Sequence, residues 1–308
     1  CSSDLVDDVM ALWSGLGYYS RARNLHRCAQ EVMARYAGKF PNTAKELETL
    51  PGIGRSTAGA IAAFAFEERV PILDANVKRV ISRFFGITSD QQSNKTVQLL
   101  WEHAGAILPK SKSQMPLYTQ ALMDFGATWC TPKTAKCLSQ DRSCPMMSEC
   151  KAYELGLVNR IPAKKKKKPS PIFTTHIFLI RHHDEVLLEK RPVKAIWGGL
   201  YSLIETPWEP LAKKIIHPKS IDVKDLLNQT CLTNHLSKND IDSIVSIEES
   251  HAIEHVFSHR RLQMQPWVIH LKRKWQCADA SLNWVCTSRL MEYGLPQPIR
   301  SFLESNSR

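Results

Sequence analysis

Two kinds of side chain in this sequence could do chemistry, an isolated carboxylate and a set of thiols. Asp74 stands two residues before Asn76 and just ahead of an apolar and basic stretch, 77–85, that predicts a helix. A carboxylate in this place could stabilise developing positive charge, although an aspartate before a helix is also a common N-cap. Four cysteines within 21 residues indicate a metal or cluster site: Cys130, Cys137, Cys144 and Cys150.

A glycine hairpin must position the carboxylate. Pro51 precedes Gly52 and Gly54, and glycine tolerates positive φ, so this turn can point its backbone N–H groups outward. From Ser56 to Phe66, small and apolar residues predict a helix. A phosphate over those N–H groups and the helix N-terminus would be bound without any base being read. A Gly-x-Gly turn is also common as a simple connection between two helices, without any binding function.

Residues 50–80 together resemble the helix-hairpin-helix motif (50–66) and following aspartate of base-excision DNA glycosylases. The string GLGYYSRARNL, residues 15–25, resembles the matching stretch of MutY-type adenine DNA glycosylases. Aromatic faces beside Arg21 and Arg23 suit stacking on a displaced base step while phosphates are held. By resemblance, Tyr18 wedges into the duplex beside the lesion. The alternative is a core tyrosine beside solvated arginines.

Composition is consistent with a nucleic-acid partner. The chain has 308 residues, enough for two domains, a net charge of +11 and a pI near 9.2, which favour a polyanion. It has no apolar run of membrane-spanning length and no export signal at its start. Its nine cysteines therefore indicate a reducing compartment, and we expect a cytoplasmic, nucleoid-associated protein. Because it starts with Cys1, the chain is expected to be a fragment or a processed product.

The periodicity predicts two domains of different class. Residues 1–158 are expected to be all-α, with helices at about 5–16, 21–36, 43–49, 58–66, 77–85, 94–107 and 115–126. Residues 159–171 form a linker of prolines and five lysines, Lys164 to Lys168. Residues 172–308 show an α+β pattern with strands near 175–183, 186–192, 256–257 and 262–271 and a helix near 224–227.

The second domain resembles the MutT-like, Nudix-related domain of the MutY family, including the WGGL at 197–200. No Nudix glutamate box occurs between residues 205 and 227, so we expect no pyrophosphatase activity. By resemblance, Phe257, Ser258 and His259 contact 8-oxoguanine. A serine–histidine pair in a strand loop could also be purely structural.

The spacing of the cysteines does not decide between zinc and an iron–sulfur cluster. No short Cys-x2-Cys pair typical of a zinc ribbon is present. The glycosylase family carries a [4Fe-4S] cluster on C-x6-C-x2-C-x5-C, and this chain has the first and last gaps but six residues in the middle one. Extra loop length costs little, so the resemblance implies a [4Fe-4S] cluster.

The resemblance implies excision of adenine opposite 8-oxoguanine from double-stranded DNA. Flipping exposes the nucleotide, and Asp74 stabilises positive charge at C1′ while Asn76 orients it or the sugar. Lyase-type relatives place a lysine where this chain has Ser56, and a hydroxyl forms no imine, so a monofunctional hydrolase is expected. Further DNA contacts are expected from the hairpin and the helix after Asp74: Gly52, Gly54, Arg55, Ser56 and Lys78.

Three other interpretations remain. The family's general-acid glutamate lies upstream of the start of this chain, so we expect impaired or absent activity, and a non-catalytic protein that binds 8-oxoguanine lesions is the first alternative. A zinc-stabilised DNA-binding module is the second. An endonuclease III-like lyase is disfavoured by Ser56 and by the long second domain. The chain shows no coiled-coil heptads, and a monomer is expected.

Overall fold

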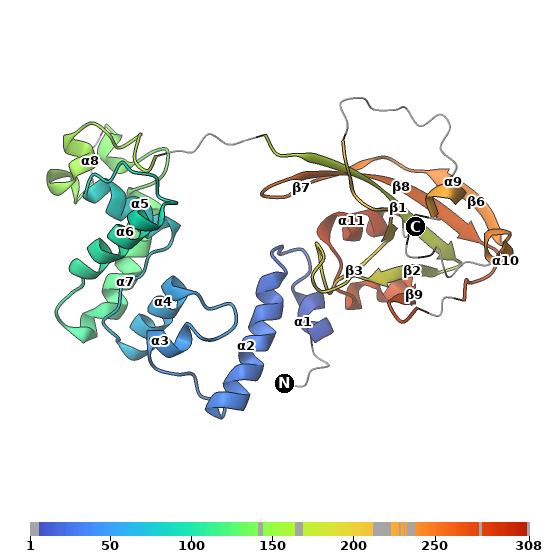
Figure 1. Cartoon of the computed structure of the whole chain (residues 1–308), viewed down its shortest axis with the longest axis horizontal. Coiled ribbons are helices and arrows are strands. Elements are labelled where there is room, and N and C mark those ends of the chain that lie inside the picture. The colour runs from blue at the N-terminus through green and yellow to red at the C-terminus, as the bar shows by residue number, and fades with distance from the viewer. Residues whose placement is uncertain are drawn as a thin grey trace. The chain divides into compact units, whose positions relative to one another are not determined.

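The computed structural model of the chain describes residues 6–140, 144–163, 169–211, 223–227, 229–230, 232, 238–276 and 279–306. The predicted lysine run Lys164 to Lys168 lies outside these residues. No helix among the described residues is long and apolar enough to cross a membrane. Figure 1 labels the elements in chain order.

The chain divides into two compact units, and the division differs from the predicted boundary near residue 158. One unit combines Cys1–His26 with Lys168–Arg308, and the other is Arg27–Lys167. The reason lies in the packing of the first helices: Met10, Tyr19 and Ala22 are buried in the same cluster as Ile177 and other residues of the C-terminal sheet. Helical periodicity alone does not show which partner a helix packs on.

The helical unit matches the predicted all-α class, because no strand occurs among its described residues. Its α-helices are α2 (Ser20–Tyr36, which begins in the other unit), α3 (Ala44–Leu47), α4 (Arg55–Phe66), α5 (Ala75–Phe84), α6 (Asn94–Ala106), α7 (Met115–Asp124) and α8 (Lys151–Glu154). Short 3-10 and π turns complete it: η2 (Lys112–Gln114), η3 (Phe125–Trp129), η4 (Lys136–Leu138) and η5 (Met147–Glu149).

Side chains set the ends of these helices. Thr43 caps α3 by accepting a hydrogen bond from the Glu46 N–H, and Ser93 caps α6 in the same way. The predicted helix at 5–16 is shorter in the structure, where α1 spans Val6–Leu12. Gly15 follows it with φ of +88°, a conformation that ends a regular helix.

The second unit is built on a mixed sheet. Among the described residues, strands β3-β2-β1-β8-β6 lie in this order, with β1 and β8 parallel over ten residue pairs. The strands are β1 (Ile172–His182), β2 (Glu185–Lys190), β3 (Tyr201–Ser202), β4 (Ile204–Glu205), β5 (Glu209–Pro210), β6 (Ile244–Glu249), β7 (Ile253–Val256), β8 (Arg261–Leu271) and β9 (Leu282–Cys286). Its helices are α1, α9 (Val223–Leu227), α10 (Lys238–Ile241), η6 (Thr287–Glu292) and α11 (Gln297–Ser305).

Alternate residues of β1 face opposite sides of this sheet, as strand geometry requires. Ile177 and Leu179 pack with α1, the start of α2 and α11 on one face, whereas Phe178 and Ile180 pack with α9 on the other. The sheet is therefore covered on both faces, which agrees with the predicted α+β class. Strands β6 and β9 were not expected, because their short segments show little alternation of apolar and polar residues.

Stability of this unit is expected to fall in mild acid because of His176. Its Nδ1 accepts a hydrogen bond of 3.0 Å from the Trp267 indole, and burial lowers the pKa of His176. As pH falls below about 6.5, the unfolded chain takes up a proton that the folded chain resists, so the folded state loses stability. Chemical denaturation from pH 7.5 to 5.5 should show a smaller loss for His176→Gln, whose amide oxygen can accept the same bond; parallel curves would contradict this.

Candidate functional site

The hairpin between α3 and α4 turns at Gly52, whose φ is +78°. Gly54 differs from expectation, because it has φ −87° and ψ 168° and serves as the N-cap of α4. A glycine cap supplies no side chain, so the first amides of α4, at Arg55, Ser56 and Thr57, have no partner within the helix. N–H groups at a helix N-terminus can donate hydrogen bonds to an anion, and phosphate binding at this hairpin stays a prediction.

The segment that carries Asp74 is held against the start of α4. The Leu73 N–H donates a hydrogen bond of 2.9 Å to the Ser56 hydroxyl. A Cβ on Gly59 would lie only 2.6 Å from the Pro71 carbonyl oxygen, so the two backbones touch where glycine leaves room. Ser56, predicted as a DNA contact, thus also ties the glycine hairpin to the residue before Asp74.

Asp74 is the N-cap of α5, and its Oδ1 accepts a hydrogen bond of 2.7 Å from the Val77 N–H. It is half-buried, as is Asn76 in the first turn of the same helix. Both interpretations of this residue can hold together, because the cap engages one carboxylate oxygen and fixes the orientation of the other. Lys78 follows on the helix and is partly exposed.

Arg79 is a residue that sequence reasoning missed. Its guanidinium is buried and donates to the Asn76 Oδ1 at 3.0 Å, to the Gly126 carbonyl at 2.6 Å and to the Cys130 carbonyl at 2.7 Å. One side chain therefore joins Asn76 to the first cysteine of the predicted cluster site. The basic character of 77–85 is the only sequence signal for it, and that signal suggests solvent or phosphate as the partner.

All four predicted cysteine ligands line one cavity of about 360 Å³. Arg83 reaches the same place, where its guanidinium lies 3.3 Å from the Cys130 Sγ and donates to the Thr131 carbonyl at 2.8 Å. Burial raises the pKa of Cys137, and the thiols of Cys144, Cys130 and Cys150 raise it further. All four cysteines line the same cavity even though the middle gap of the motif is six residues long.

This donor set fits an iron–sulfur cluster in chemical type, since four soft thiols line one cavity beside a cation that stabilises thiolate charge. Among the described residues, no three or more Cys, His, Asp or Glu side chains are arranged to share a single metal ion.

A second cavity, of about 570 Å³, lies entirely within the C-terminal unit. It brings together residues that the sequence placed far apart. The loop 15–20 with Tyr18 forms one wall, and Phe257, Ser258 and His259 form another at the turn between β7 and β8. The Ser258 Oγ and the His259 Nδ1 lie 3.2 Å apart.

The two adjacent tyrosines differ in exposure: Tyr18 faces solvent and Tyr19 is buried. Tyr18 is 68% exposed, with φ of +49°, and the guanidinium of Arg21 lies over its ring at 5.1 Å. Tyr19 is buried, and its hydroxyl donates to the Leu295 carbonyl at 3.4 Å. Arg23, predicted as a DNA contact, donates to the Gly198 carbonyl and so joins α2 to the WGGL loop.

The rings of Trp197, His255 and Phe257 line the second cavity and pack against one another. The ring of Phe257 lies 4.5 Å from His255, 5.4 Å from Trp197 and 5.9 Å from Trp208. Trp197 has φ of +58°, and burial lowers the pKa of His255, which favours a neutral imidazole. Phe257 is therefore a fixed member of a packed cluster.

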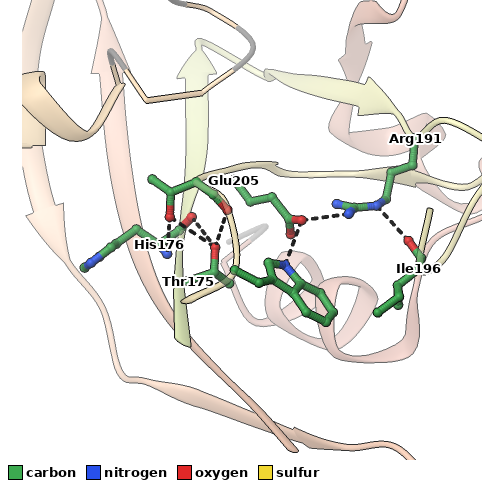
Figure 2. A network of polar contacts seen from close by, with 7 residues as sticks. Thr175, His176, Arg191, Ile196 and Glu205 are labelled. Carbon is green, nitrogen blue, oxygen red and sulfur yellow. Dashed lines mark hydrogen bonds and ion pairs between the residues drawn. The ribbon is translucent and has the colours of Figure 1, made fainter. Parts of the chain in front are cut away.

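A buried ion pair holds this cluster in place. Arg191, at the end of β2, donates to the Ile196 carbonyl at 2.9 Å and pairs with Glu205 at 2.7 Å (Figure 2). The Trp208 indole donates to the same Glu205 oxygen at 2.9 Å. The pair fixes both the loop that carries Trp197 and the ring of Trp208. Sequence reasoning missed it, since neither charged residue stands in a recognisable motif.

Comparison with known proteins identifies the family of each part of the chain. Residues 3–105 match the model of the HhH-GPD superfamily base excision DNA repair protein, and residues 176–305 match the NUDIX domain. The chain is 32% identical over 301 residues to the adenine DNA glycosylase of Buchnera aphidicola subsp. Schizaphis graminum, covering 97% of this chain and 79% of that protein. It is 33% identical to the Arabidopsis thaliana adenine DNA glycosylase, over 95% of this chain and 49% of that protein.

Among solved structures, a thermostable thymine-DNA glycosylase aligns with a TM-score of 0.38 and 36% identity over 44% of this chain and 59% of that one. A helix-hairpin-helix unit joined to a Nudix-like unit defines a base-excision DNA glycosylase of MutY type. The chain belongs to the adenine DNA glycosylase family. It is thus a DNA repair enzyme of the class that hydrolyses the bond between adenine and deoxyribose.

The buried ion pair gives a stability prediction. Arg191 and Glu205 side chains are each 10% exposed, and removing one charge leaves the other buried, so Glu205→Gln should lower the free energy of unfolding by about 3 kcal/mol. Glu292→Gln is the matched control, since Glu292 pairs with Arg289 at an exposed site, and it should leave the denaturation midpoint unchanged. Equal effects of the two variants in urea titrations would contradict this account.

Proposed function

We propose that the protein removes adenine paired with 8-oxoguanine in double-stranded DNA and leaves an abasic site. The observation that carries the proposal is the second cavity, which brings the exposed ring of Tyr18 and the turn 257–259 to one place within a single unit. A ring that enters the duplex beside a turn that contacts the oxidised base would read the lesion while the adenine is flipped out.

In this proposal the hairpin holds the backbone of the DNA, and the N–H groups at the start of α4 donate hydrogen bonds to a phosphate. Asp74 stabilises the positive charge that develops at C1′ as the bond to adenine breaks. Its cap to the Val77 N–H keeps the carboxylate oriented, and Asn76, held by Arg79, orients the sugar. Ser56 has no amine to form an imine, so the product is an abasic site with an intact strand.

We also propose that Cys130, Cys137, Cys144 and Cys150 hold a [4Fe-4S] cluster. Their shared cavity and the cation of Arg83 support this. Such a cluster would supply a rigid cross-link between the four thiolates. Through the Cys130 carbonyl and Arg79, the loop that carries the cysteines is joined to Asn76.

The catalytic proposal is tested with Asp74→Asn. Asparagine caps a helix as well as aspartate does, so the fold and DNA affinity should be retained. Loss of the negative charge should lower single-turnover adenine release from a duplex with A opposite 8-oxoguanine on the order of 10²- to 10³-fold. Phe257→Ala should instead reduce the preference for 8-oxoguanine over guanine in the opposite strand. Adenine release by Asp74→Asn equal to measurable release by the unaltered chain, or strand cleavage without alkali, would refute the mechanism. No release by the unaltered chain would refute the catalytic proposal for this chain and favour a non-catalytic protein that binds the lesion.

The cluster proposal is tested by metal content. The purified chain should contain iron and sulfide and absorb broadly in the visible range, and Cys144→Ala should lose both. Cys28→Ala is the matched control, because Cys28 is a buried free thiol packed in another cluster of side chains. Stoichiometric zinc without visible absorbance, or equal iron in both variants, would exclude the cluster.

A further inference from the structure

Arg55, the first residue of α4, makes a contact that the proposed reaction does not explain. Its guanidinium carbon lies 4.0 Å from the centroid of the Trp101 ring in α6. The other cation–aromatic contacts among the described residues are longer, from 5.1 to 5.9 Å. Arg55 is exposed, and no hydrogen bond or ion pair to another described residue engages its guanidinium.

The chemistry of this contact leaves the guanidinium free for an anion. Stacking on a ring uses the flat face of the cation, whereas its N–H donors lie in the plane and point outward. A phosphate accepts two such donors side by side, in the geometry that favours arginine over lysine. An arginine already stacked on a ring also loses less conformational freedom when it binds.

Trp101 is well placed to hold the arginine, because it is anchored in the core. It packs against the buried cluster that includes Leu73, Val77 and Leu100. The same cluster therefore fixes the residue before Asp74 and the ring under Arg55. In addition, the Arg55 amide is one of the three unpaired N–H groups at the start of α4.

We propose that Trp101 is a positioning residue that presents the guanidinium of Arg55 as a clamp for one phosphate of the DNA backbone. The clamp lies in the first turn of the hairpin's second helix and adds a fixed positive charge to its neutral N–H donors. The proposal rests on the proposed phosphate-binding role of the hairpin. It assigns a function to an aromatic residue that is not among the proposed catalytic or lesion-recognition residues.

A double-mutant cycle tests the clamp, with fluorescence anisotropy of the full chain on an undamaged duplex. Arg55→Ala should weaken binding roughly tenfold and lower the slope of log affinity against log salt by about 1. Trp101→Leu should weaken binding on the order of 2- to 5-fold, and Trp101→Phe, which keeps a ring, should retain most of the affinity. In the Arg55→Ala background, Trp101→Leu should cause no further loss.

Arg35→Ala is the matched control, since Arg35 is an exposed arginine over the ring of Tyr36 at 5.2 Å but pairs with Glu31. It should leave affinity unchanged. If Trp101→Leu weakens binding equally with and without Arg55, its role is only structural and the clamp is refuted. Equal affinity of Arg55→Ala and the unaltered chain would refute it as well.

Gly54→Asp separates the clamp from the hairpin itself. A Cβ on Gly54 meets nothing within 4 Å, so aspartate fits there, caps the helix and occupies its N–H groups with a negative charge. Strong loss of DNA binding with an additive Arg55–Trp101 cycle would refute the clamp and keep the hairpin. Unchanged binding by Gly54→Asp would refute the hairpin's phosphate role, and with it the basis of the clamp.

Discussion

The arrangement of the candidate active site depends on the contact between α4 and the segment 71–73. Two features make this contact possible: the bond from the Leu73 N–H to the Ser56 hydroxyl and the absence of a side chain at Gly59 beside the Pro71 carbonyl. Both contacts hold Asp74 at a fixed position in space relative to the amides at the start of α4. In the proposed reaction, a phosphate held by those amides and a sugar beside the carboxylate would therefore be held in a fixed relation to each other.

The second cavity is held together by a different kind of interaction. Part of its lining is a cluster of aromatic rings, and aromatic packing alone permits several arrangements of similar energy. The buried pair of Arg191 and Glu205 selects one of them, because its hydrogen bonds reach the Ile196 carbonyl and the Trp208 indole. Such a pair is expensive to desolvate, so its value here lies in specificity of position more than in stability.

Local features of the fold could be predicted from the sequence, because each depends on residues that are close together in the chain. The glycine hairpin, the helix after Asp74 and the strand segments of β1 and β8 follow from glycine, capping and apolar patterns, whereas the parallel pairing of these two strands was not predicted. Asp74 shows a limit of this reasoning, since an N-cap and a catalytic carboxylate have the same local signature. Only the structure shows that the residue forms a cap and leaves one oxygen outside it.

Contacts between distant segments could not be predicted. Arg79 reaches a carbonyl 51 residues away, and Arg23 reaches one 175 residues away, so nothing near either arginine identifies its partner. The grouping of residues up to His26 with the C-terminal sheet belongs to the same class, because an amphipathic helix fits many apolar surfaces equally well.

Tyr18 adopts a left-handed backbone conformation that a bulky aromatic residue rarely tolerates. Holding it there costs on the order of 1 kcal/mol of folding free energy. Burial of the neighbouring Tyr19 in the core offsets this cost. In the proposed role, the exposed ring would meet the DNA in a conformation that the unfolded chain seldom visits. Conformational entropy that a flexible loop would lose on binding DNA would then be lost during folding instead.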